Sequence, residues 1–288
     1  MSVLRPAAPW RPALSLTDPY VRRARSLPAM PEVAARLLTS FDRDDLSLHE
    51  VASLIGRDQA LSAQVLRMAN SARYAHHAKV SSLNDAAQRL GLRALRDLTL
   101  TACVARAFPE VPGFDRMHFW RGTLAVAAYA QAMAPALKVQ ADTAYLGGLM
   151  LRTGQLLMML EDAGACADVA LHAMELDSRI GFEAVVLGCT HPEVTSELAR
   201  HWGFPRGLVT AFGAAADPMV VRPFNELGAA LRLASVVDEC REAGDDVAQA
   251  LRMTHPGVLA HMNLDVEALT AGLPDHQLAC AGAETLMH

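Results

Sequence analysis

The chain has 288 residues, of which 52% are hydrophobic and only 5% aromatic, and its formal net charge at pH 7 is −5. This length provides one large core or two modest ones. Apolar runs rich in Leu, Ala, Val and Met, without β-branched alternation, argue against sheets and predict an all-α fold. The first 110 residues are mildly basic through arginine and the remainder is acidic, which fits a solvated helical surface better than a nucleic-acid-binding stripe.

Cysteine usage and hydropathy argue against secreted and membrane classes. The five cysteines are scattered and form no CxxC pair, a pattern typical of reduced thiols in a cytoplasmic protein rather than of a disulfide framework or a zinc site. The longest apolar stretches are Thr123–Leu137, which is too short to span a bilayer, and Tyr145–Leu160, which contains Arg152 and Gln155. The sequence therefore predicts a cytoplasmic protein with no membrane partner.

The N-terminal part of the chain begins with a segment that is rich in Pro and Arg and shows no period. Residues 1–26 are therefore predicted to form an extended arm. Residues 27–110 are predicted to form an N-terminal helical half, because Pro31, the Ser47/Glu50 capping box and Gly91 are typical helix starts and ends. One helix is expected to begin near Pro31, and further helices are expected at 47–56, 59–70, 82–91 and 92–108.

The second half begins after the clearest internal break, at Pro109–Gly113. Residues 111–220 are predicted to form a second helical half, and residues 221–288 a C-terminal helical extension packed on the core. The helices expected here span 116–137, 142–160, 192–202 and 223–241, with another opening at Pro205 and short helices from residue 245.

One helix pair resembles a helix-turn-helix. The segments 47–56 and 59–70 flank a short turn, and the second helix would offer Gln64 and Arg67 to base edges. The rest of that helix is apolar, as expected of two packed helices in a core. DNA binding through this pair is therefore the weaker interpretation, and no specific nucleic-acid partner is expected.

Metal and catalytic motifs are sparse. His76 and His77 are adjacent in a predicted loop, and the histidines of the predicted helices are isolated from one another. The apolar cluster around Met150 and Met158 is more typical of core than of a pocket. The sequence contains no Gly-rich phosphate loop, no GxSxG and no HExxH.

A family resemblance rests on motifs spread over residues 25–220. These are Leu-Pro-Ala-Met-Pro at 27–31, Asp-Gln-Ala-Leu at 58–61, Leu-Arg-Met-Ala-Asn-Ser at 66–71, Leu-Gly-Leu-Arg at 90–93, Phe-Trp-Arg at 119–121, Gly-Gly-Leu at 147–149, His-Pro-Glu at 191–193 and Trp-Gly-Phe-Pro at 202–205. With these motifs the chain resembles the HDOD (HD-related output domain) family, and the match is less clear beyond residue 220. The hallmark residues, expected to be structural, are Asn70, Ser71, Gly91, Trp120 and Trp202.

The resemblance implies a multi-helix bundle related to the HD superfamily, whose catalytic members hold metals through a His, a His-Asp pair and a later Asp. The corresponding positions in this chain are Gly122, Leu151-Arg152 and Ser235, with Gln155 at an associated Lys and Ala215-Ala216 at a His-His pair. None of these positions carries the expected residue type. The one family ligand position that still holds a histidine is His191, and one imidazole cannot hold a di-metal centre. We therefore expect no cofactor, no metal ligand and no catalytic residue.

HDOD proteins are regarded as regulatory modules of bacterial signalling, which implies a non-catalytic role here through contacts with signalling proteins. A small anionic, nucleotide-like ligand in the vestigial metal pocket is the main alternative. That pocket is expected to be lined by Met150, Arg152, Gln155 and His191. A metal-dependent phosphohydrolase or phosphodiesterase is the weakest alternative. The Arg152 head should face this pocket and meet a carboxylate, for which Asp142, Glu161 and Asp162 are near in sequence.

Overall fold

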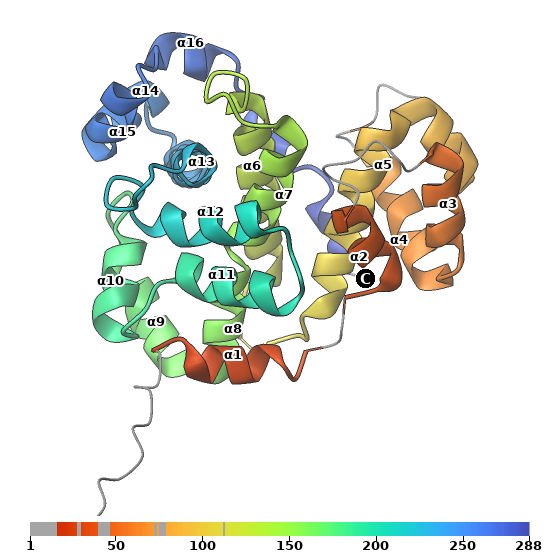
Figure 1. Ribbon diagram of the computed structural model, residues 1–288, viewed down its shortest axis with the longest axis horizontal. Helices are drawn as coiled ribbons and strands as arrows, with labels where there is room; N and C mark the ends of the chain where they lie inside the picture. Colours follow the sequence, from red (N-terminus) through yellow and green to blue (C-terminus); the bar gives the residue numbers. More distant parts are fainter. Residues whose placement is uncertain are drawn as a thin grey trace, which may run out of the picture.

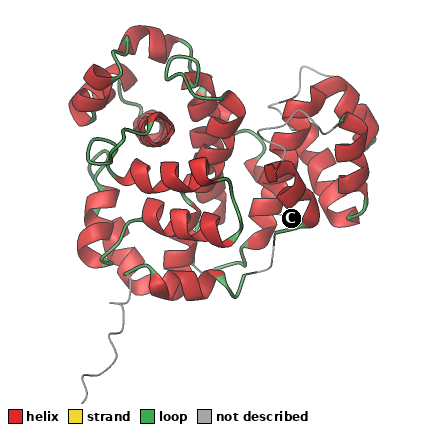
Figure 2. Cartoon of the chain, in the orientation of Figure 1, coloured by secondary structure: helices red, strands yellow, loops and turns green. Residues whose placement is uncertain are grey.

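The computed structural model describes residues 16–27, 30–39, 47–71, 74, 79–111 and 113–287, and all regular structure within them is helical (Figure 1, Figure 2). The prediction of an all-α fold is therefore confirmed. Residues 1–15 of the predicted arm, residues 28–29 of the first family motif, and His76 and His77 lie outside the described residues.

Among the described residues of the N-terminal half there are four α-helices, and several of their ends lie at residues that the sequence indicates. They are α2 (Glu32–Thr39), α3 (Leu48–Gly56), α4 (Gln59–Ala69) and α5 (Leu83–Ala107). Ser47 and Glu50 form the expected capping box at the start of α3. Gly91, with φ of +80°, divides α5 into two helical pieces at the predicted boundary. A side chain at this φ would be strained, so glycine is required there.

The prediction of an extended arm over residues 1–26 is wrong for part of that segment. Asp18–Ala24 form helix α1, which contacts α8 and α11 of the second half rather than the neighbouring α2 (Figure 1). Tyr20 and Ala24 are buried, so apolar burial stabilises a helix that would be too short to persist alone. Pro19 lies in the first turn, where a missing N–H costs nothing, and it therefore starts this helix instead of breaking it.

The second half is built around α6 and α7, and α13 packs on both of them. The described helices of this half are α6 (Arg116–Met133), α7 (Ala141–Leu151), α8 (Thr153–Glu161), α9 (Ala163–His172), α10 (Arg179–Val186), α11 (His191–His201) and α12 (Arg206–Ala216), and α13 (Glu226–Ala243) is the first helix of the C-terminal extension. A Cβ at Gly148 would lie 2.6 Å from the Ala127 Cα. The family motif glycine therefore allows α6 and α7 to approach more closely than any side chain would permit.

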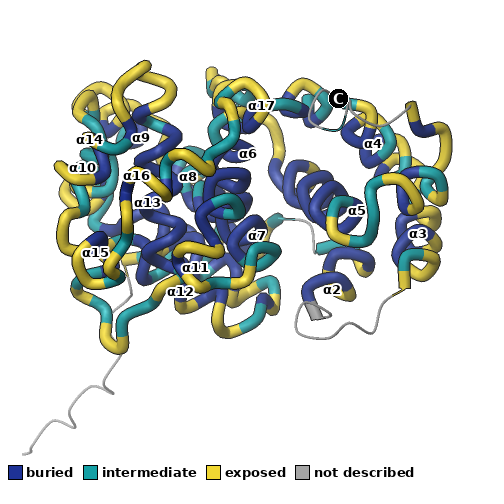
Figure 3. Tube along the Cα trace, turned by 90° about the horizontal axis from the view of Figure 1, so that it is seen from above, coloured by how far each residue is buried: buried dark blue, intermediate teal, exposed yellow. Residues whose placement is uncertain are grey.

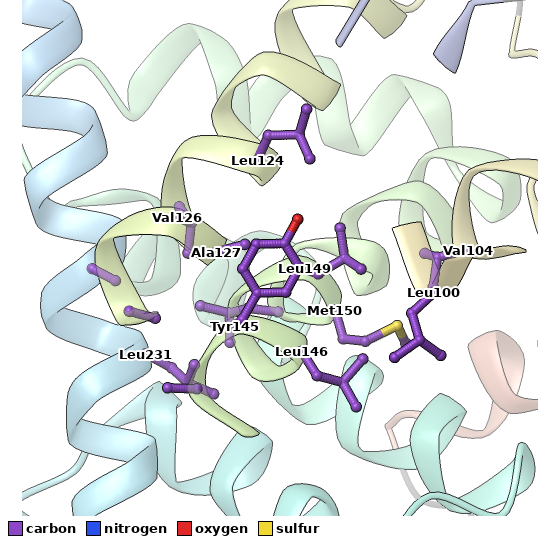
Figure 4. Close-up of a cluster of buried hydrophobic side chains, with 14 of the residues drawn as sticks. Leu100, Val104, Leu124, Val126, Ala127, Tyr145, Leu146, Leu149, Met150 and Leu231 are labelled. Carbon is purple, nitrogen blue, oxygen red and sulfur yellow. The ribbon is translucent and has the colours of Figure 1, made fainter. Parts of the chain in front are cut away.

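The two halves share one hydrophobic core. Buried segments of α5, α6, α7 and α13 make up its centre (Figure 3). Leu100 and Val104 of α5 lie beside Leu149 and Met150 of α7 (Figure 4). Each of these four side chains is at most 1% exposed. Burying such a side chain is worth about 1.5–3 kcal/mol, so this apolar contact holds the halves together.

The C-terminal extension leads back to the N-terminal half. It contains α14 (Val247–Thr254), α15 (Pro256–His261), α16 (Val266–Ala271), α17 (His276–Cys280) and the 3₁₀ helix η2 (Ala283–Leu286). α17 packs on α6, where the Tyr129 hydroxyl lies 2.9 Å from His276 Nδ1. η2 contacts both α6 and α4. The last helices therefore bridge the two halves.

The hallmark residues make structural contacts. Asn70 makes a two-way hydrogen bond with Val80, whose N–H donates to the Asn70 side chain and whose carbonyl accepts from it. Trp120 is fully buried, and its ring centroid lies 5.2 Å from that of Phe119. The Trp202 ring centroid lies 5.9 Å from that of Phe108 at the end of α5, so it joins the two halves.

One of the two side chains that the helix-turn-helix interpretation assigned to base contacts is buried. Gln64 was expected to be exposed on the second helix, but it is only 4% exposed because α4 packs against α5 on that side. Arg67 is exposed. The pair α3–α4 therefore forms part of the core of the N-terminal half.

Candidate functional site

The candidate site lies where α6, the α7–α8 junction, the start of α11 and α13 come together. Arg152 stands between α7 and α8, as the C-cap of the first and the N-cap of the second. His191 is the first residue of α11, after a Thr190/Glu193 capping box. Gly122 is on α6, and Ser235 is on α13. These helix ends bring together residues that are more than 100 positions apart.

The Arg152 guanidinium forms a buried ion pair with Asp238, with 2.8 Å between Arg152 Nη2 and Asp238 Oδ2. The two side chains are 13% and 1% exposed. Burial raises the pKa of the Asp238 carboxyl, and the Arg152 charge opposes this rise. A carboxylate this deeply buried is tolerated because a full positive charge lies beside it.

The same guanidinium occupies the space next to Gly122. A Cβ at this position would lie 2.2 Å from Arg152 Nη1 and 3.0 Å from Asp238 Oδ2. Both distances are far below ordinary van der Waals contact, so any side chain at position 122 would displace the ion pair. The absence of a side chain on α6 and the presence of a long cationic one at position 152 are therefore complementary.

His191 is held by a second carboxylate that the sequence did not suggest. Its Nδ1 and its backbone N–H lie 2.7 and 2.8 Å from Glu183 Oε2, and both residues are at most 4% exposed. Burial raises the pKa of Glu183, but the neighbouring His191 and the hydrogen bonds from it outweigh this effect, so the pKa of Glu183 lies below its ordinary value. His191 Nε2 has no hydrogen-bond partner among the described residues.

These groups face a cavity of about 870 Å³. Arg152, Gln155, His191 and Ser235 line it, in a region enclosed by α8, α9, α10 and α13. Met150 does not, and its expected place in the pocket is wrong. It lies in the shared core beside Leu100, because its position on α7 faces α5 rather than α13 (Figure 4).

The carboxylates near Arg152 in sequence have other roles. Asp142 lies beside Arg96 and Arg93, and Asp162 caps the start of α9. The actual partner, Asp238, is 86 positions downstream, one helical turn after Ser235. The three-residue spacing between Ser235 and Asp238 could have identified this partner from the sequence, because residues three apart on a helix share a face. The expectation of an inward Arg152 next to a carboxylate agrees with the structure, whereas the suggested partners were wrong.

The residues present do not fit a di-metal centre. The guanidinium carries a full positive charge into the place that a cation would need, and it already uses the nearest carboxylate. Among the described residues, no three or more His, Cys, Asp or Glu side chains are grouped so as to hold a metal ion. No described helix combines the length and the apolar character that a bilayer crossing requires.

Comparison with known proteins gives a family and a set of folds. The model of the HDOD domain matches residues 27–218. The structure is similar to that of a Shewanella amazonensis protein provisionally named a phosphohydrolase, with a TM-score of 0.75, 27% identity, and coverage of 93% of this chain and 98% of that one. An HDOD domain protein of unknown function from Geobacter sulfurreducens has a TM-score of 0.70 and 24% identity, with 88% of this chain and 92% of that one covered.

A Marinobacter aquaeolei protein, provisionally named a signal transduction protein, has a TM-score of 0.74 and 22% identity. The likeness covers 96% of this chain but 62% of that one. An uncharacterized protein of Treponema pallidum is 24% identical over 204 residues, which are 68% of this chain and 38% of that protein. The chain thus spans well under half of the length of this relative.

Proposed function

The chain belongs to the HDOD family, and from that premise we propose that it is a non-catalytic regulatory module of bacterial signal transduction that acts by contacting other proteins. Family membership supports the signalling or regulatory role, and one protein of similar fold carries a signal-transduction name. The phosphohydrolase name belongs to the Shewanella protein. For this chain, the chemistry must be argued from its own residues.

The observation that carries the proposal is the Arg152–Asp238 ion pair beside Gly122. Metal-assisted hydrolysis needs a cation that lowers the pKa of a bound water or polarises the phosphoryl oxygen. Here a side-chain cation neutralises the buried carboxylate instead. A guanidinium stays protonated at physiological pH, so it can donate hydrogen bonds but cannot generate a hydroxide nucleophile. The former catalytic position has thereby become part of the folded core.

A module without its own chemistry must act by binding. We propose that its partners are signalling proteins and that it works in the cytoplasm, which the five free cysteines support. Its single shared core, on which α1 packs and across which η2 joins the two halves, would present a stable surface to a partner.

The non-catalytic part is tested by elemental analysis and hydrolysis assays on protein purified after growth with Fe, Mn and Zn. We expect a substoichiometric metal content and no hydrolysis of bis(p-nitrophenyl) phosphate or a cyclic dinucleotide with any of these metals added. A His191→Ala variant is the control. About one metal per chain that is lost in this variant, together with hydrolysis that disappears with it, would overturn the proposal.

The interaction part is tested by affinity purification from the native cell, with wild-type and Arg152→Ala baits in parallel. Candidates shared by both baits are then purified and titrated individually by calorimetry. We expect at least one signalling protein to form a saturable complex. If every candidate fails to bind in purified form, the protein–protein interpretation is wrong even if no hydrolysis is found.

A further inference from the structure

The cavity next to Arg152 is lined by more carboxylates than cations. The acidic side chains at its surface are Asp115, Glu175, Asp177, Glu183, Glu239, Glu242 and Asp245. The arginines at its surface are Arg152, Arg179 and Arg232. On α13, Ser235, Glu239 and Glu242 follow one another at helical spacing, so this helix presents a polar and largely acidic stripe to the cavity.

Each of the three guanidinium groups already has a carboxylate partner. Arg152 pairs with Asp238 and Arg232 with Asp177, both at 2.8 Å. Arg179 lies 4.0 Å from Glu183. His118 also lines the cavity and lies 3.1 Å from Glu242. Even so, the carboxylates at the cavity surface outnumber the cationic side chains, so these pairs leave an excess of negative charge there. An anion would therefore enter against several negative charges, which argues against the nucleotide-like ligand that Arg152 suggested from the sequence.

An independent feature at the inner end of the cavity indicates a ligand. His191 is 4% exposed and lines the cavity, and its Nε2 has no partner among the described residues. Its Nδ1 lies 2.7 Å from Glu183 Oε2, so Nε2 is the ring nitrogen that is left to form a hydrogen bond with a ligand. A buried polar atom without a partner is unfavourable, and a hydrogen-bonding group of a ligand would satisfy it.

The remaining wall of the cavity is apolar. It includes Phe114 and Phe119 near the start of α6, Met158 and Met159 on α8, and Ile180 on α10. The volume of about 870 Å³ is within the range of small-molecule sites. Aromatic faces and thioethers accept both aliphatic and aromatic bodies, and an aromatic face also attracts a cation.

We propose that this cavity binds a small organic cation, with an amine or guanidinium group on an aromatic or aliphatic body. The cationic group lies against Glu239 and Glu242, a polar group of the ligand forms a hydrogen bond with His191 Nε2, and the apolar body lies between the aromatic and methionine side chains. Such a ligand would give the regulatory module an input. The proposal does not depend on the identity of any protein partner.

The test uses two probes with the same indole skeleton and opposite charge, tryptamine and indole-3-propionate, titrated by calorimetry into the full chain at low ionic strength. We expect tryptamine to bind at least tenfold more tightly, and added salt to weaken its binding. The double variant Glu239→Gln/Glu242→Gln should lose about tenfold in tryptamine affinity, because two carboxylates are neutralised. Glu226→Gln, on the same helix but outside this cavity, is the matched control and should bind normally.

A second variant tests the location. Ala170 is exposed and lines the cavity, so Ala170→Trp should obstruct the entrance without disturbing the core, and tryptamine binding should fall at least tenfold. The proposal is overturned if indole-3-propionate binds as well as tryptamine, if Ala170→Trp leaves affinity unchanged, or if tryptamine shows no binding up to about 10 mM. None of these outcomes bears on metal content or on the binding of a protein partner.

Discussion

Replacing Arg152 by alanine is expected to lower the free energy of unfolding by about 3–5 kcal/mol. The change leaves Asp238, which is 1% exposed, without the cation 2.8 Å away that compensates its burial. Arg106 is the matched control, because its guanidinium also lies 2.8 Å from a carboxylate, that of Asp58, but both side chains are 39% exposed. Arg106→Ala should cost no more than about 1 kcal/mol.

The assay is urea denaturation followed by circular dichroism and tryptophan fluorescence, with stability compared at pH 7. A double variant, Arg152→Met/Asp238→Leu, removes both charges and should recover most of the loss, because apolar replacement of a buried pair is often neutral or stabilising. A loss of less than about 1 kcal/mol for Arg152→Ala would refute the reasoning. It would show that the carboxylate takes up a proton or reaches water at little cost.

Three further predictions concern close packing and pH. Gly122→Ala should destabilise the wild-type chain by about 1–3 kcal/mol and much less in an Arg152→Ala background, because its Cβ collides with the guanidinium; equal costs in urea denaturation of both backgrounds would contradict this. Gly148→Ala should lower the melting temperature more than Gly213→Ala. A Cβ at Gly148 would lie 2.6 Å from backbone, whereas a Cβ at Gly213 would lie 3.8 Å from its nearest neighbour. Similar melting temperatures of the two variants would contradict this prediction. Burial raises the pKa of Asp177 from 3.8 to about 6, so the folded state holds this proton more tightly, and the stability it contributes is full below about pH 4 and is lost as the pH rises through 6. Relative to Asp177→Asn, the wild type should therefore lose about 2 kcal/mol between pH 4 and pH 7, and a constant difference over that range would disprove the assignment.

Much of the fold follows from local signals in the sequence. The Ser47/Glu50 capping box starts α3 where it was predicted, and Gly91 divides α5 at the predicted residue. These signals are readable because helix ends depend on a few adjacent residues that satisfy backbone groups. The family motifs carried the rest of the fold prediction. Of the hallmark residues, Trp120 and Trp202 make aromatic packing contacts and Asn70 makes a hydrogen bond with Val80.

The predictions that failed depended on contacts between distant segments. α1 was taken for an extended arm because nothing in its seven residues shows that α8 and α11 will bury Tyr20. Gln64 is polar and was placed on the surface, and only the packing of α4 on α5 buries it. Met150 was assigned to the pocket because its neighbour Arg152 is there, although α7 turns its side chain toward α5.

For the candidate site too, some features follow from residue identity and others from contacts between distant segments. The sequence by itself determined that metal ligands are missing at Gly122 and Arg152, because the identity of a residue decides whether it can donate a lone pair to a cation. Only the tertiary structure decided that Asp238 neutralises Arg152, that Glu183 holds His191, and that the cavity between them is acidic. Charge pairing and burial depend on which helix faces meet in space, and residues 86 positions apart meet only through the packing of the whole bundle.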